Sequence, residues 1–136
     1  MKQVSKLLLS LALVGLSVPA MADSFWNHNG SVMRLTADGN NREFTYEEPT
    51  DRMIGAGVTT GTVLFTGKRT GNRYSGTAYV FSKDCDAPLP YKVSGTVQKN
   101  ETKVVMTGTR KSYGAGCRPT GRTTKDTRVF TYMSTE

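Results

Sequence analysis

The chain has 136 residues and carries 18 lysines and arginines against 11 acidic residues, a net charge of +7. This length accommodates one domain with a hydrophobic core and excludes a large multidomain enzyme. The charge is uneven, because residues 23–60 carry a net −3 and residues 61–136 a net +8. The basic part favours an anionic partner such as lipopolysaccharide or an acidic glycan, although surface charges that only keep a domain soluble give the same composition.

The first 22 residues have the order of a secretory signal peptide. Lys2 and Lys6 precede an apolar run over residues 7–16, and Ala20-Met21-Ala22 forms a small-x-small cleavage box. The apolar run is shorter than the roughly 20 residues of a membrane anchor, and no later segment reaches that length. We therefore predict cleavage after Ala22, a single β domain over residues 23–136, a periplasmic or secreted location and no transmembrane segment.

The remaining apolar runs are short, alternate with polar residues and are separated by turn-forming residues, which is typical of strands. Three hairpins are expected, followed by a last strand; the seven strands cover residues 33–36, 43–47, 62–66, 74–81, 91–97, 103–108 and 127–133. A loop with a short helical turn near residues 53–54 separates the first two hairpins. The spacing predicts an all-β fold: an antiparallel meander of seven to eight strands that forms a small barrel or a sandwich, with a closed barrel as the first choice.

Three glycines lie inside these expected strands, at Gly76, Gly95 and Gly108. Glycine weakens a strand interior, so a specific reason for its presence is needed. Sharp bends or bulges at these positions are expected, because a short sheet must coil strongly in order to close.

Cys85 and Cys117 are the only two cysteines. In an oxidising compartment such a pair is expected to form one disulfide. The bond would close about 33 residues and, on the chain-entropy model, stabilise the fold by roughly 3–4 kcal/mol. A zinc site is a poor alternative, because two cysteines and one distant histidine cannot supply four ligands.

The candidate chemistry at the start of the domain rests on Trp26 and His28. His28 is the only histidine, and no serine lies in a sequence motif typical of a catalytic nucleophile. No catalytic residue is therefore assigned. We expect Trp26 to plug one end of the barrel and His28 to bond to backbone in the turn before the first strand. An exposed Trp26 that stacks on a sugar or other ligand is the alternative.

A second candidate surface is the basic, glycine-rich segment at residues 110–122. It contains Arg110, Lys111, Arg118 and Arg122, and the expected disulfide at Cys117 would tie it to the loop around Cys85. Long loops on rigid β scaffolds often carry recognition, so we interpret this segment as a loop that presents four positive charges together. A solvated loop without a partner is the simpler alternative.

Four segments carry a further pattern: W-N-H-N-G-S at residues 26–31, residues 61–65, Y-S-G-T-A-Y-V-F at residues 74–81, and residues 91–95. Together they resemble a group of small exported proteins and modules of rhizobia and related alphaproteobacteria. The resemblance covers nearly the whole predicted domain. It implies a bacterial periplasmic or secreted origin and provides no catalytic residues.

The sequence thus favours a non-enzymatic exported β domain that binds an anionic envelope component or another protein. It gives no sign of a metal site, a cofactor or specific nucleic-acid recognition. Two further hypotheses remain: an inhibitor that blocks a hydrolase, and a ligand-carrying barrel or enzyme that uses Trp26 and His28. A filled barrel interior would favour the binding domain, and an open pocket that holds His28 beside a carboxylate would favour the enzyme.

Overall fold

The computed structural model describes residues 22–136, so the predicted signal peptide lies outside the described residues except for Ala22. Eight strands account for most of this part. They are β1 (Ser24–His28), β2 (Ser31–Asp38), β3 (Asn41–Glu48), β4 (Val63–Thr70), β5 (Arg73–Val80), β6 (Leu89–Gln98), β7 (Lys103–Gly114) and β8 (Arg118–Thr135). A short helix, α1 (Asp51–Gly55), lies between β3 and β4, and a 3-10 turn, η1 (Ala115–Cys117), joins β7 to β8.

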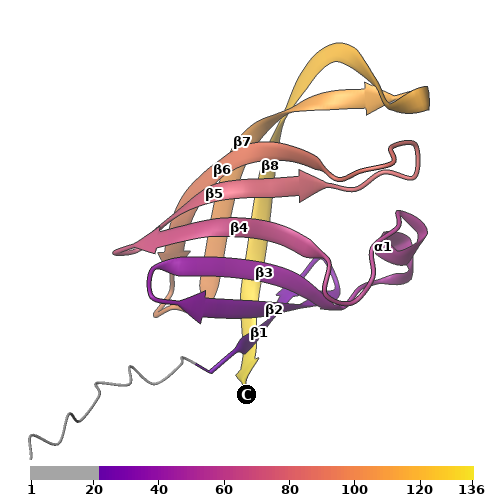
Figure 1. The fold of residues 1–136 in the computed structure, drawn as a ribbon. Coiled ribbons are helices and arrows are strands. Elements are labelled where there is room, and N and C mark those ends of the chain that lie inside the picture. Colours follow the sequence, from indigo (N-terminus) through magenta and orange to yellow (C-terminus); the bar gives the residue numbers. More distant parts are fainter. Residues whose placement is uncertain (1–21) are drawn as a thin grey trace, which may run out of the picture.

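The strands form a closed antiparallel barrel (Figure 1). Each strand pairs with the next along the chain, and β1 pairs with β8 to complete the circle. The expectation of an all-β meander is confirmed, and the architecture is a barrel rather than a sandwich. Closure leaves neither β1 nor β8 as a free edge along its paired residues, which removes a surface prone to aggregation.

Several strand boundaries differ from the sequence prediction, and two of the differences change the interpretation. Residues 24–28 form a strand, β1, where a turn was expected, because this segment supplies the partner that β8 needs for closure. In addition, β8 begins at Arg118 and not near residue 127, and it pairs with β7 as far as Gly114↔Arg118. The basic segment at residues 110–122 is therefore a β-hairpin, and its prediction as a long loop is wrong.

The interior glycines serve close approach between strands. A Cβ atom at Gly95 would lie 1.7 Å from the carbonyl oxygen of Val105, and one at Gly76 would lie 2.3 Å from that of Thr66. The register shifts of the barrel lie elsewhere, for example between Val32 and Met33. These glycines thus leave room for a neighbouring backbone, and they are not the sites of bulges.

An aromatic stack fills the middle of the barrel. The Phe44 and Phe130 rings lie 4.0 Å apart, Trp26 meets Phe44 edge-on, and His28 stacks on Phe130. Every strand contributes to this core, and Val58 joins it from the segment between α1 and β4. The core consists of Trp26, Met33, Leu35, Phe44, Tyr46, Val58, Leu64, Phe65, Tyr74, Ala78, Tyr91, Val93, Val104, Met106 and Phe130. Burial of each large apolar side chain contributes roughly 1.5–3 kcal/mol.

The core leaves the two ends of the barrel distinct (Figure 1). Helix α1, the β5–β6 loop and the tip of the β7–β8 hairpin lie at one end, called here the α1 end. The short β2–β3, β4–β5 and β6–β7 turns lie at the other, called here the turn end. Each end contains one cleft of interest.

Candidate functional site

The cleft at the α1 end has a volume of about 190 Å³. Its walls combine polar and aromatic side chains from β1, β2, β3, β5, β8 and the α1 region. The lining residues are His28, Asn29, Ser31, Tyr46, Thr50, Arg52, Met53, Val80, Phe81 and Arg128.

His28 forms one wall of this α1-end cleft. It is 3% exposed, and its Nδ1 lies 2.8 Å from the carbonyl oxygen of Val129, so Nδ1 carries the proton and donates it. Burial lowers the pKa of His28, the hydrogen bond to Val129 opposes this effect, and the positive charge of Arg128 adds to the lowering. The imidazole is therefore neutral near pH 7, with Nε2 as an acceptor that Asn29 Nδ2 approaches at 3.5 Å.

Two hydroxyl groups line the α1-end cleft together with this histidine, and one of them, Ser31, is its cross-strand partner on β2. Ser31, which is 1% exposed, accepts a hydrogen bond from the backbone N–H of Thr50 at 3.1 Å and keeps its own proton free to donate. Tyr46 is 2% exposed, and its O–H has no acceptor among residues 22–136. Since no fully buried polar side-chain atom of these residues lacks a partner, the Tyr46 hydroxyl must face the cleft. Burial raises the pKa of Tyr46, so this hydroxyl remains a donor at neutral pH.

Two arginines line the α1-end cleft, the exposed Arg52 and the more buried Arg128, whose Nη2 lies 3.7 Å from Asp126 Oδ2. The Nε of Arg128 donates to Tyr91 Oη at 2.8 Å, and its Nη2 donates to the carbonyl oxygen of Tyr79 at 3.3 Å. Asp126 accepts a hydrogen bond from Tyr91 Oη at 3.2 Å and one from Arg110 Nε at 2.6 Å. Within the described chain, Arg128 Nη1 has no acceptor, so it can hold an anionic or carbonyl oxygen of a ligand.

Arg128, Tyr91, Asp126 and Arg110 form a polar cluster. This polar cluster also bridges a seam in the barrel wall, the stretch where β6 and β7 are no longer paired. The pairing of β6 with β7 runs from Ser94↔Thr107 to Gln98↔Lys103, and beyond it β7 pairs only with β8. The side chains of Tyr91, Arg110 and Asp126 then connect β6, β7 and β8 where the backbone ladder ends. Burial of polar groups is tolerated here because each has a partner.

The two candidate residues of the first strand lie at opposite ends of the barrel. His28 belongs to the α1-end cleft, whereas Trp26 is 4% exposed and lines the cleft at the turn end. His28 does bond to backbone, but from strand β1 and to Val129 of the neighbouring strand β8. The structure therefore does not bring Trp26 and His28 together into one site.

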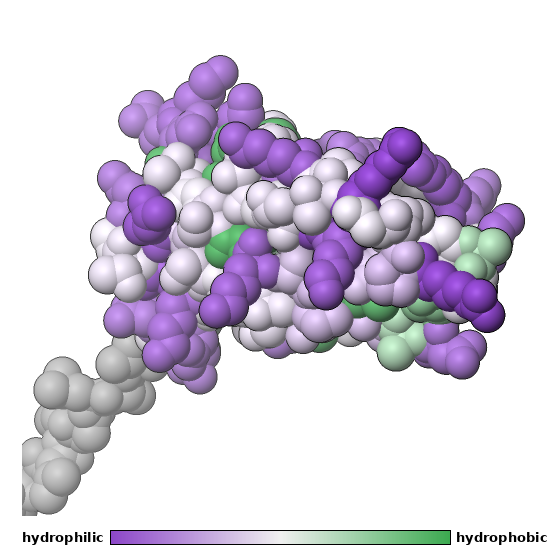
Figure 2. Space-filling model, turned by 90° about the horizontal axis from the view of Figure 1, so that it is seen from above, coloured by the Kyte–Doolittle hydropathy of each residue, from purple (hydrophilic) through white to green (hydrophobic). Residues whose placement is uncertain are grey.

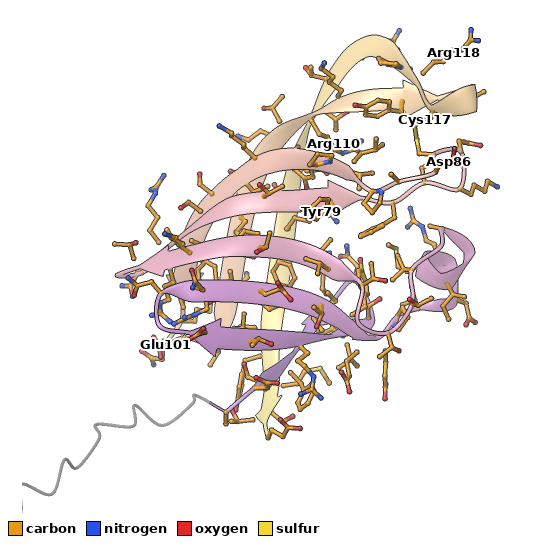
Figure 3. All side chains as sticks on the ribbon, in the orientation of Figure 1. Tyr79, Asp86, Glu101, Arg110, Cys117 and Arg118 are labelled. Atoms are coloured by element: carbon orange, nitrogen blue, oxygen red, sulfur yellow. A yellow bond between two sulfur atoms is a disulfide. The ribbon has the colours of Figure 1, made fainter. Side chains whose placement is uncertain are left out.

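The four basic residues of the hairpin are also separated. Arg110 pairs with Asp126, and Figure 3 shows Arg110 well below Arg118, which lies at the hairpin tip beside Cys117. Lys111, Arg118 and Arg122 are exposed. The hypothesis that all four present their charge together is corrected: three are available at the surface, and the fourth is part of the polar cluster.

The predicted disulfide between Cys85 and Cys117 is confirmed. It joins the β5–β6 loop to η1, with Cα atoms 4.9 Å apart. The bond ties the tip of the β7–β8 hairpin, which β6 no longer supports, to the α1 end of the barrel.

Among residues 22–136 there is no group of three or more histidines, cysteines or carboxylates that could hold a metal ion. The same residues contain no helix of sufficient length and hydrophobicity to cross a membrane. The face on the hairpin side is largely hydrophilic, with only small, separated hydrophobic patches (Figure 2). That face therefore offers no broad apolar contact surface.

The chain belongs to the class of small closed antiparallel barrels, whose interior is either filled by side chains or leaves room for one small ligand. No protein-family profile and no curated protein matches the chain. Among solved structures, the barrel is similar to that of rhizavidin in its complex with biotin, with a TM-score of 0.56 and 19% sequence identity. The match covers 85% of this chain and 94% of the rhizavidin chain, and it shows that the two share a fold.

Sequence reasoning missed several polar residues at both ends of the barrel. Tyr46 and Arg128 complete the α1-end cleft, and Arg42 and Tyr74 line the turn-end cleft. A usable signal was present: Arg42 precedes Phe44 and Tyr46 at two-residue spacing, and Arg128 precedes Phe130 in the same way. A charged residue in phase with the inward side of a strand indicates a polar site inside a barrel.

Proposed function

We propose that this chain is a non-enzymatic binding protein that holds a small organic ligand in the α1-end cleft. The observation that carries the proposal is the convergence of unused donors on this cleft: the hydroxyl of Tyr46, the hydroxyl of Ser31 and Nη1 of Arg128. Three donors around a small cavity suit a carboxylate or a polarised carbonyl oxygen. The aromatic surfaces of Phe81 and Tyr46 would contact the rest of the ligand.

The similarity to rhizavidin supports a ligand-holding barrel over a hydrolase inhibitor or an enzyme, because the rhizavidin barrel is described in complex with biotin. Biotin carries both a carboxylate and a ureido carbonyl, which makes it a suitable first probe. We extend the proposal to small molecules with either group. An envelope component or protein partner, the leading interpretation from the sequence, would use the surface of the barrel and calls for a separate test on the hairpin.

We also propose that the protein acts outside the cytoplasm. The Cys85–Cys117 disulfide supports this location, since such bonds persist in oxidising compartments. N-terminal sequencing of protein recovered from the periplasm of an expressing bacterium should begin at Asp23. An intact Met1 on correctly folded protein from that fraction would refute cleavage after Ala22.

The binding proposal is tested by calorimetric titration of the purified protein with biotin and with a panel of small carboxylates and cyclic ureas. Tyr46→Phe removes one donor whose proton has no acceptor in the described chain, so the variant should fold normally and bind roughly tenfold more weakly. Tyr113→Phe, on the hairpin outside the cleft, is the matched control. Equal affinity of the Tyr46→Phe variant and the wild type, or no binding across the panel, would overturn the proposal.

A further inference from the structure

The turn end of the barrel holds a larger cleft, of about 420 Å³, that the proposed function does not use. Its walls are mostly apolar, and its largest apolar contributors are Trp26, Leu35, Val97, Val104 and Tyr132. The aromatic stack around Phe44 and Phe130 separates it from the α1-end cleft. The turn-end cleft is therefore a distinct space with its own chemistry.

Buried hydrogen-bond donors face this cleft. Arg42 is only 8% exposed; its Nη1 donates to the carbonyl oxygens of Gly39 and Asn41, and its guanidinium also donates to the hydroxyl oxygen of Tyr74. Tyr74 is 1% exposed, and its own hydroxyl proton has no acceptor in the described part of the chain. Both side chains line the cleft, and a fully buried polar atom without a partner does not occur among the described residues, so these donors reach the cavity.

A second arginine lies at the mouth. Arg69 donates through Nε to the carbonyl oxygen of Gly71 and through Nη2 to Glu101 at 2.5 Å. Glu101 is the one acidic side chain that lines the turn-end cleft in the described structure, and it is 67% exposed. Figure 3 shows Glu101 at the end of the barrel opposite Cys117. Glu101 is largely exposed, whereas the Arg69 side chain is 21% exposed, so an anion that enters the cleft can compete with the solvated Glu101 carboxylate for Arg69.

We propose that the turn-end cleft is a second binding site, for an amphipathic organic carboxylate. The carboxylate would accept hydrogen bonds from Tyr74, Arg42 and Arg69, and the apolar body would lie against Trp26, Val104 and Tyr132. Two arginines with a single competing acid favour an anion over a neutral molecule. The apolar walls exclude a small hydrophilic anion as the preferred ligand, since burial of apolar surface provides much of the binding energy in such clefts.

The chain contains its own reporter for this site. Trp26 is the only tryptophan, and it lines the turn-end cleft and not the α1-end cleft. Its fluorescence during titration of the purified protein with octanoate should therefore change with saturation. Octanol has a similar alkyl chain but no charge, and acetate has the charge but almost no alkyl chain. These two molecules are the matched probes, and both should bind at least tenfold more weakly than octanoate.

Three variants locate the site. Tyr74→Phe should weaken octanoate binding roughly tenfold without loss of fold, because the proton it removes has no acceptor. Glu101→Gln should strengthen binding severalfold, because it frees Arg69. Tyr46→Phe, in the α1-end cleft, should leave the octanoate-dependent change of Trp26 fluorescence unchanged, because Trp26 lines only the turn-end cleft, and this readout keeps the test independent of the proposed function. Equal binding of octanol and octanoate, an unaltered Tyr74→Phe variant, or weaker binding in Glu101→Gln would overturn the proposal.

Discussion

Phe44 and Phe130 stack face to face in the centre of the barrel, with ring centroids 4.0 Å apart and ring planes 11° apart. Both side chains are fully buried. Trp26 on one side and His28 on the other extend this pair toward the two ends. The stack therefore acts as a partition, and the two clefts can hold chemically different ligands without a continuous channel between them.

The stacked pair Phe44 and Phe130 should also contribute strongly to the free energy of unfolding. Phe130→Ala removes a fully buried ring from the middle of the barrel, and the cavity left behind should lower the free energy of unfolding by about 3–5 kcal/mol. Met133→Ala changes a side chain on the same strand that is 50% exposed and should have little effect. Denaturant unfolding of both variants provides the measurement. A loss below about 1 kcal/mol for Phe130→Ala would contradict a close-packed partition.

The disulfide should stabilise the protein and keep the hairpin tip in place. Replacement of Cys85 and Cys117 by serine should lower the free energy of unfolding by roughly 3–4 kcal/mol on the chain-entropy model, since the half-cystines are 32 positions apart. Mass measurement before and after reduction should differ by two hydrogens. Free thiols in untreated, exported protein would refute the bond, and an unchanged melting temperature of the double serine variant would refute its stabilising role.

The alternation of apolar and polar residues predicted the all-β meander well, because every second side chain of a barrel strand is buried. Residues 24–28 were missed as a strand although β1 pairs locally with β2 across Asn29-Gly30, a turn signal present in the sequence; only its second partner, β8, lies about a hundred residues away. The clefts were missed for a different reason. The two-residue spacing of Arg42 and Arg128 from buried aromatic residues indicates that they face inward, but it does not show that an inward residue borders a cavity.

The cysteine pair was the most predictable element of the α1 end. Two cysteines allow a single pairing, so no knowledge of the fold was needed. The charge on the hairpin was misjudged because Arg110 has a partner, Asp126, sixteen residues further along the chain. That contact depends on the antiparallel pairing of β7 with β8, which the predicted loop did not include.

The pH dependence of stability should report on His28. Its pKa in the folded protein lies below the unfolded value near 6.5, so the unfolded chain binds more protons between the two values. The free energy of unfolding should therefore fall as the pH drops below about 6.5, with a slope of at most about 1.4 kcal/mol per pH unit from this group. His28→Gln should flatten this part of the profile between pH 5 and 7. If His28→Gln and the wild type show the same pH profile over this range, His28 is not a buried, neutral group.

The hairpin should divide into an outer basic surface and an inner structural arginine. Lys111, Arg118 and Arg122 are exposed, so their combined replacement by alanine should leave the melting temperature nearly unchanged. If the hairpin contacts an anionic envelope component, that triple variant should be retained less than the wild type in a pull-down of envelope fractions at low salt. The difference should shrink at high salt, because exposed charges are screened over roughly 8–10 Å near physiological ionic strength.

Arg110 should behave in the opposite way. Its guanidinium and the Asp126 carboxylate are both about three-quarters buried, so Arg110→Ala leaves the acid without its closest partner. We expect a loss of about 1–3 kcal/mol in the free energy of unfolding and little change in envelope retention. Comparison of Arg110→Ala with Arg122→Ala in the same two assays separates the roles. Equal retention of the triple variant and the wild type would show that the outer charges only make the surface soluble. A fully stable Arg110→Ala variant would show that the polar cluster does not hold the seam.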